Sequence, residues 1–196
     1  MSGKRDNSKI RVLGIGASPL KGGSTDTLLD LALEGARSCG ALTEKVTLND
    51  LHFVFCQECG SCITSGVCIR RDDMTSVYEK VGKADVIVFS SPIFFANLTA
   101  QAKAFIDRFQ CAWVSKNVLG KALDGAQKKG ALLCVSAVEK REYFENSRSV
   151  VKAFFSTIGA TYSAELYCGG IEKAVDVLDN KWLMDKAFML GKSLCE

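Results

Sequence analysis

The sequence has 196 residues, a formal net charge of +3 and 47% hydrophobic residues, which are ordinary values for a globular protein of one domain. The charge is too small, and the basic residues too scattered, to predict a nucleic-acid interface. The polar N-terminus does not fit a secretion signal, and no uncharged apolar run is long enough to cross a bilayer. We therefore expect a cytoplasmic protein with no membrane contact.

The first half of the chain alternates between apolar strands and amphipathic helices. Residues 10–15 and 42–48 predict strands, and residues 25–40 between them predict a helix that ends at a glycine. After a cysteine-rich stretch, residues 72–84 predict a helix that begins at an aspartate suited to N-capping. The strongly apolar residues 84–92 then predict a strand that runs into a Ser-Pro turn.

The second half continues the alternation after one less regular stretch at 110–129. The predicted elements are a helix at 98–109, strands at 130–137 and 161–168, and helices at 141–159 and 180–196. Alternation of this kind predicts an α/β fold with a parallel sheet and helices on both faces. We find no repeat or linker, so we expect a single domain over residues 1–196. Ligands of open parallel sheets bind at the carboxyl ends of the strands, so the loops there are the first candidates for a site.

The loop after the first strand, residues 16–27, is rich in hydroxyl groups. Ser18, Ser24, Thr25 and Thr27 lie just before a helix or in its first turn. Exposed N–H groups and the helix dipole favour a phosphate at such a position, and hydroxyl donors suit a phosphate monoester. Simple N-capping of the helix by Ser24 or Thr25 explains the same residues equally well.

The loop after the third strand, residues 90–101, is aromatic. Ile93, Phe94 and Phe95 could lie along a flat ring, while Asn97 and the local backbone could bond its polar edge. The alternative is that the two phenylalanines belong to the core or to an oligomer interface. Taken together, the two loops describe a site for a phosphate joined to a planar heterocycle, as in FMN.

Four of the nine cysteines occur in one short stretch, within a predicted loop insertion at 52–71. Cys56, Cys59, Cys62 and Cys68 have the spacing C-x2-C-x2-C-x5-C. A [4Fe–4S] cube needs four thiolates, and a tight loop can wrap three of its corners before the chain returns with the fourth. Four-thiolate zinc sites usually use two separated C-x2-C pairs, so the spacing favours a cluster. Redox-sensitive or idle thiols are the third interpretation. The other five cysteines are expected to be small apolar fillers: Cys39, Cys111, Cys134, Cys168 and Cys195.

Three stretches together resemble the flavodoxin-like NADPH-dependent FMN reductase superfamily, and within it the iron–sulfur flavoprotein branch. They are "GASPLKGGSTDTLL", "FCQECGSCITSGVCIRRDDM" and "ADVIVFSSPIFFANLTAQAKAFIDRF". The resemblance implies a flavodoxin-like three-layer sandwich with a five-stranded parallel sheet in the order 2-1-3-4-5. It also implies FMN contacts from Ser18, Leu20, Lys21, Gly23, Ser24 and Thr25, from Pro92, Ile93, Phe94 and Phe95, and from Ser136 and Ala137. Leu20 stands where the family usually has arginine, with Lys21 as a substitute charge, and Phe94 stands where tyrosine is common.

A cluster carries one electron at a time and a flavin carries one or two. The resemblance therefore implies an oxidoreductase that passes electrons between a ferredoxin-like carrier or NAD(P)H and an acceptor. It further implies a homodimer or homotetramer that brings cluster and flavin together across subunits. We assign no protein acid or base, and we expect Asp107 and Arg108 to be structural. The alternatives are a cluster-free NAD(P)H-dependent FMN or quinone reductase, and a non-enzymatic electron carrier or redox sensor.

Overall fold

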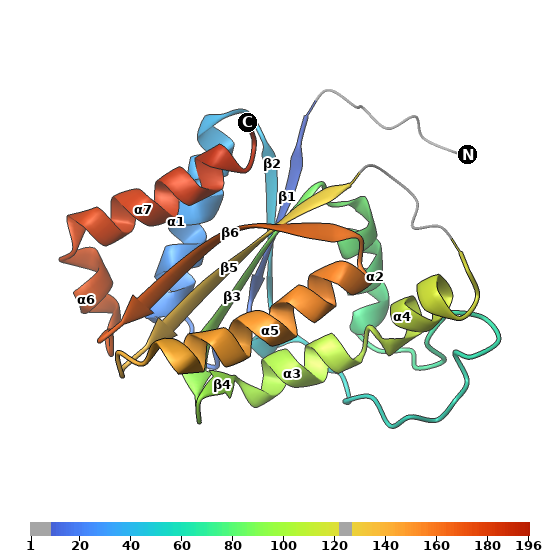
Figure 1. Ribbon diagram of the computed structural model, residues 1–196. Helices are drawn as coiled ribbons and strands as arrows, with labels where there is room; N and C mark the ends of the chain where they lie inside the picture. The colour runs from blue at the N-terminus through green and yellow to red at the C-terminus, as the bar shows by residue number, and fades with distance from the viewer. Residues whose placement is uncertain (1–8, 122–126) are drawn as a thin grey trace.

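A twisted parallel sheet forms the centre of the computed structural model, which describes residues 9–121 and 127–196 (Figure 1). Its strands lie in the order β2-β1-β3-β5-β6. Their bounds are β1 Arg11–Gly16, β2 Leu42–Thr47, β3 Val86–Phe94, β5 Lys128–Ser136 and β6 Ala160–Gly169. The two-residue strand β4 (Asn97–Leu98) pairs antiparallel with the end of β3. With this hairpin strand set aside, the order is the predicted flavodoxin-like one.

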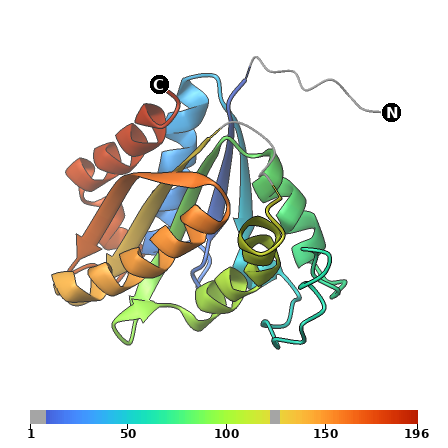
Figure 2. The same cartoon turned by 45° about the vertical axis from the view of Figure 1, so that its right-hand side comes forward.

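Helices cover both faces of the sheet, as predicted (Figures 1 and 2). Their bounds are α1 Ser24–Ser38, α2 Met74–Lys83, α3 Ala100–Asp107, α4 Gln110–Asn117, α5 Arg141–Thr157, α6 Ala174–Leu178 and α7 Lys181–Ser193, with a 3₁₀ turn η1 at Leu48–Asp50. Each strand divides its side chains between two cores, because successive residues of a strand point to opposite faces. In β3, Ile87 and Phe89 pack with α2, α3 and α5, whereas Val86 and Val88 pack with α1 and α7.

The sequence analysis was wrong about part of the stretch 110–129. Residues 110–117 form α4, which buries Cys111 and Val114, and β5 already begins at Lys128. Residues 122–126 of this stretch lie outside the described residues. The short helix α6 and the strand β4 were also not predicted. In the described parts of the chain, no helix is both long enough and apolar enough to cross a membrane.

Helices α1 and α7 approach each other closely through two glycines. A Cβ atom on Gly35 would lie 1.9 Å from the carbonyl oxygen of Phe188, and one on Gly191 would lie 1.7 Å from that of Ala32. Both distances are much shorter than a van der Waals contact. The atoms that would clash belong to the backbone, so they cannot move aside as a flexible side chain can. The packing of this helix layer therefore depends on the absence of a side chain at both positions.

We expect Gly35→Ala to destabilise the protein by about 1–3 kcal/mol, because the added methyl group forces the two helix backbones apart. Gly82→Ala is the matched control, since nothing lies within 4 Å of the position that its Cβ would take. That variant should gain up to about 1 kcal/mol from helix propensity. Urea unfolding measures both, and equal effects of the two substitutions would contradict the packing argument.

Candidate functional site

The carboxyl ends of β1, β3 and β5 lie side by side and hold the loops at 16–27 and 90–101 together. Hydrogen bonds tie the loops directly. Ala17 N–H donates to the carbonyl of Ser90 (2.7 Å), and the Thr99 hydroxyl donates to the carbonyl of Ala17 (2.9 Å). The Ser90 hydroxyl donates to the carbonyl of Thr25 (3.0 Å). Two segments far apart in sequence thus form one continuous edge.

The entry of α1 presents hydroxyl groups that its own structure does not use. Gly23 occupies the N-cap position, so Ser24 and Thr25 lie in the first turn, and the alternative that either one caps the helix was wrong. Both side chains are buried. Among the residues that the structure describes, neither hydroxyl makes a hydrogen bond, whereas that of Thr27 donates to the carbonyl of Gly23 (3.1 Å). The helix therefore begins with free hydroxyl and N–H donors, which suit an anion.

The remaining residues predicted in this loop have other roles in the structure. The Ser18 hydroxyl accepts from Leu20 N–H (3.1 Å), so it shapes the turn before the helix. The Leu20 side chain is mostly exposed, and Lys21 forms an exposed ion pair with Asp50 (2.6 Å). In the structure the charge of Lys21, which was predicted to substitute for the usual arginine, is therefore paired with the Asp50 carboxylate.

A partly buried set of ion pairs next to the loop was not predicted from the sequence. Lys45 of β2 lies 2.6 Å from the Asp26 carboxylate and 2.7 Å from that of Asp30. Burial opposes the charge of Lys45, but the hydrogen bonds and charges of the two aspartates outweigh it and raise its pKa. Asp26 also accepts from Gly22 N–H (2.9 Å). Lys45 thereby offsets a negative charge in the first turn of α1.

The aromatic loop is a tight hairpin at the end of β3. Phe95 and Ala96 adopt positive φ values of 47° and 63°, and the Asn97 side chain accepts from Leu98 N–H (2.8 Å). The Phe95 side chain is fully exposed and that of Phe94 is about half exposed, so neither belongs to the core. Ile93 packs against the core from the base of the hairpin. The hairpin thus carries two aromatic rings out from the sheet edge.

The third predicted contact lies at the end of the neighbouring strand. Val135 of β5 pairs with Pro92 of β3, so Ser136 follows directly beside the aromatic loop. The Ser136 hydroxyl accepts from Val138 N–H (3.2 Å), and Ala137 is exposed. Most of the residues predicted to contact FMN therefore gather on adjoining strand ends.

The cysteine loop runs from η1 to α2 without helix or strand and projects beside α4 (Figures 1 and 2). Cys56, Cys59, Cys62 and Cys68 all line one cavity of about 140 Å³. Burial raises the pKa of the Cys62 thiol, whereas a hydrogen bond to Ser61 lowers that of Cys59. Within residues 9–121 and 127–196, no three metal-binding side chains converge on a single-ion site. The four thiols are instead distributed around the cavity wall.

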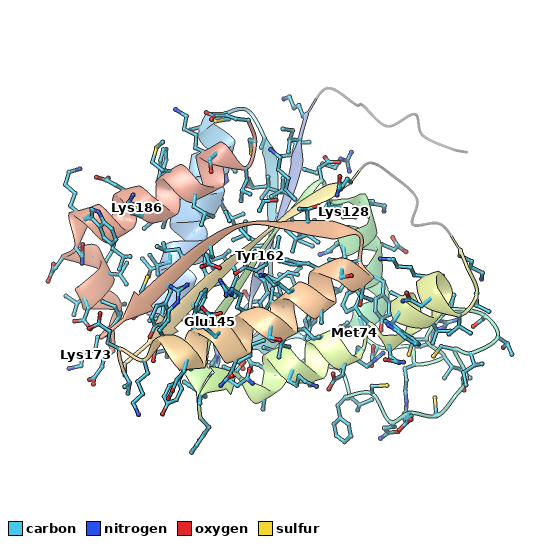
Figure 3. The ribbon with its side chains drawn as sticks, viewed as in Figure 1. Met74, Lys128, Glu145, Tyr162, Lys173 and Lys186 are labelled. Carbon is cyan, nitrogen blue, oxygen red and sulfur yellow. The ribbon has the colours of Figure 1, made fainter. Side chains whose placement is uncertain are left out.

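Arg108 of the α3–α4 junction lines the same cavity and holds the loop at both ends. Its side chain is 1% exposed and forms an ion pair with Asp72 (2.6 Å). Nη1 also donates to the Val54 carbonyl (2.6 Å), and Nη2 lies 3.6 Å from Cys68 Sγ. Asp72 in turn accepts from Met74 N–H (3.2 Å), where the loop enters α2 (Figure 3). One buried guanidinium therefore bonds the cysteine loop both before Cys56, at Val54, and after Cys68, at Asp72.

Burial works against the charge of Asp72, but its hydrogen bond and ion pair with Arg108 outweigh burial and lower its pKa. A carboxylate with a lowered folded-state pKa stabilises the protein above the ordinary value, about 3.9, and this contribution is lost as the pH falls through the folded value. The ion pair should therefore break only in strong acid.

We expect Asp72→Asn to cost about 1–3 kcal/mol near neutral pH, because a charge-assisted hydrogen bond becomes a neutral one. The difference from the wild type should begin to shrink below pH about 4, where the carboxylate of the unfolded wild type takes up a proton, and it should vanish once the pH has fallen through the lowered folded-state pKa. Urea unfolding across this range is the measurement. Asp107→Asn, which breaks an exposed pair with Lys103, should change little at any pH. A stability difference that stays constant down to pH 3 would contradict the assignment.

Comparison with known proteins identifies the family of this chain. Residues 10–165 match the family described as NADPH-dependent FMN reductase. The chain belongs to that family. As an FMN reductase family member it also resembles two curated proteins named iron-sulfur flavoprotein. One, from Archaeoglobus fulgidus, is 37% identical over 99 residues, or 50% of this chain and 45% of the relative. The other, from Methanosarcina thermophila, is 33% identical over 126 residues, or 62% of this chain and 66% of the relative.

Solved structures confirm the flavodoxin-like fold of this FMN reductase family member. An NAD(P)H:quinone oxidoreductase from Methanothermobacter marburgensis superposes with a TM-score of 0.74 at 20% identity, over 96% of this chain and 98% of that one. An FMN-dependent NADH-azoreductase from Bacillus anthracis gives a TM-score of 0.65 at 16% identity, over 95% of this chain and 100% of that one. At these identities the likeness concerns the fold alone.

Proposed function

We propose that FMN binds at the carboxyl edge of the sheet, with its phosphate at the first turn of α1. Membership of the FMN reductase family supports the cofactor. The hydroxyls of Ser24 and Thr25, which have no hydrogen-bond partner among the described residues, support the position of the phosphate. The flavin ring would lie along Ile93, Phe94 and Phe95. Asn97, Ser136 and Ala137 would border it from the hairpin and from the end of β5.

We further propose that Cys56, Cys59, Cys62 and Cys68 hold one [4Fe–4S] cluster. The single observation that carries this proposal is that all four thiols line the same cavity, together with a buried guanidinium. A cube with four iron corners needs thiolates spread around it, and its thiolate-rich shell is anionic. Arg108 suits such a group, since its guanidinium is positively charged, lines the cavity and lies 3.6 Å from Cys68 Sγ. The names of the iron-sulfur flavoprotein relatives add support.

The proposed activity is electron transfer between a ferredoxin-like carrier or NAD(P)H and an acceptor. A cluster exchanges single electrons and FMN exchanges one or two, so a protein with both can couple the two kinds of partner. The chain's own residues bind and orient the cofactors, and no side chain is assigned a proton transfer. A cluster-free NAD(P)H-dependent quinone reductase is the second candidate. It draws on a 36% identity over 47 residues with an NAD(P)H dehydrogenase (quinone) from Trichlorobacter lovleyi.

We propose that the protein acts as a homodimer or homotetramer. Phe95 is fully exposed at the hairpin tip, and the cysteine loop exposes Phe55, Val67 and Ile69. Apolar side chains gathered next to both cofactor sites favour a protein interface there.

Replacing Ser24 and Thr25 together by valine should weaken FMN binding at least tenfold. Each lost hydrogen bond to a charged group is worth roughly 1.5–3 kcal/mol, and 1.4 kcal/mol is about tenfold. Calorimetry with FMN, FAD and riboflavin measures the effect, and riboflavin affinity should not change because riboflavin lacks the phosphate. Thr27→Val is the control, since that hydroxyl already bonds Gly23. An unchanged FMN affinity in the folded double variant would move the phosphate elsewhere.

Replacing Cys62 by alanine should make the cluster labile while FMN binding survives. Each thiolate holds a separate corner of the cube, and the FMN loops belong to other segments. Iron, sulfide and flavin analysis of anaerobically prepared protein tests this, together with the rate of flavin reduction by reduced ferredoxin. Cys39→Ala, which alters an exposed thiol outside the loop, should retain full iron content. Stoichiometric zinc without iron in the wild type, or wild-type ferredoxin rates in Cys62→Ala, would refute the cluster.

A further inference from the structure

Arg108 has more hydrogen-bonding capacity at the cysteine cavity than its structural contacts use. A guanidinium carries five N–H donors. Two bond the Asp72 carboxylate, at 2.6 and 3.1 Å, and Nη1 also reaches the Val54 carbonyl at 2.6 Å. Nη2 additionally lies 3.6 Å from Cys68 Sγ, and in the described part of the chain Nε is buried without a partner. Arg108 therefore already donates one hydrogen bond to a cysteine sulfur, and Nε is its one buried donor without a partner among the described residues.

The charge of Arg108 is in a position to act on that sulfur. Its side chain is 1% exposed, so water screens it little, whereas charges in contact with solvent are strongly screened. Arg71 provides the contrast within the same loop. Arg71 is exposed, and within the described part of the chain its one hydrogen bond is to the Cys68 carbonyl, at 3.5 Å. Of these two cations, only Arg108 combines burial with an N–H directed at the thiol.

We infer that Arg108 is a positioning residue that raises the reduction potential of the cluster through Cys68. The inference rests on the proposed function, since it requires the cluster on Cys56, Cys59, Cys62 and Cys68. Reduction adds one electron from an external reductant to the cluster, and no bond is formed or broken. Hydrogen bonds to the sulfurs and the net charge of the site set the potential of such a cluster. A buried cation and its N–H donor stabilise the more negative, reduced state.

The inference predicts that removing the charge of Arg108 and removing that of Asp72 shift the reduction potential of the cluster in opposite directions. Arg108→Gln removes a positive charge and a donor from the cavity, so the potential should fall. Asp72→Asn removes the compensating negative charge and leaves the guanidinium in place, so the potential should rise. A purely structural role of the pair predicts that both substitutions loosen the loop and act in the same direction. Arg108→Lys keeps the charge without the fork of donors, so its potential should lie between those of Arg108→Gln and the wild type.

The experiment is a redox titration of the whole protein under anaerobic conditions, with dithionite as reductant and the cluster followed by electron paramagnetic resonance. We expect Arg108→Gln to shift the reduction equilibrium at least tenfold, which for a one-electron couple is about 59 mV. Arg71→Gln is the matched control, since it removes the same charge from an exposed position beside the same cysteine, and its shift should be several-fold smaller. Flavin content of each variant reports whether the rest of the fold is intact.

The outcomes separate this inference from the proposed function. A wild-type protein that binds FMN but no iron or sulfide refutes the cluster, and the role of Arg108 with it. A wild-type cluster whose potential moves in the same direction in Arg108→Gln and Asp72→Asn, or equally in Arg71→Gln and Arg108→Gln, refutes only the role of Arg108. If Arg108→Gln fails to retain the cluster, Asp72→Asn and Arg108→Lys decide, because a rise in the first with a fall in the second supports the inference and any other pattern overturns it.

Discussion

The buried guanidinium of Arg108 is the contact on which the cysteine loop depends. Between η1 and α2 the chain forms no helix or strand, so no regular backbone ladder holds it. A buried charge is tolerated only when it is paired and hydrogen-bonded, and Arg108 meets this requirement with groups at the two ends of the loop, Val54 and Asp72. Its own carbonyl accepts from the Tyr78 hydroxyl (2.9 Å) of α2. The helices α2 and α3 and the loop therefore meet at one residue.

The sheet was predictable from the sequence because its signal is local and repeated. Alternation within β3 assigns Ile87 and Phe89 to one core and Val86 and Val88 to the other, and the same rule operates in each long strand. Two of the elements that were not predicted, β4 and α6, have too few residues for a period to develop. Helix α4 buries only Cys111 and Val114, and β4 has two residues. Such elements are determined by what they pack against.

The site was predictable in the parts where residue type carries the chemistry. Hydroxyls at a helix entry, rings in a loop and four closely spaced cysteines can each be recognised without a structure. The sequence could not predict that Ser24 and Thr25 lie after the N-cap residue, since predicted helix boundaries are uncertain by one or two residues. The role of Arg108 could not be predicted either. Its expected structural role agrees with its ion pair to Asp72. Its partners Val54 and Asp72 are 54 and 36 residues away in sequence, and local sequence patterns do not predict contacts between residues so far apart.

The two parts of the proposed site differ in how the fold supports them. The loops proposed to bind FMN continue directly from strands and are joined to each other by hydrogen bonds from the Ala17 N–H and from the Ser90 and Thr99 hydroxyls, so their geometry follows from the sheet. Arg108 anchors the ends of the cysteine loop. Between Val54 and Asp72 the loop depends on turns such as that at Gly66, with a φ of 73°, and on a hydrogen bond from Lys121 to the Ser65 carbonyl (2.7 Å). Anchored ends bring the four thiols to one cavity and lower the entropic cost of gathering them around a ligand. The sheet thus determines the geometry of the proposed FMN site, whereas the Arg108–Asp72 ion pair and the Arg108–Val54 hydrogen bond anchor the loop of the proposed cluster site.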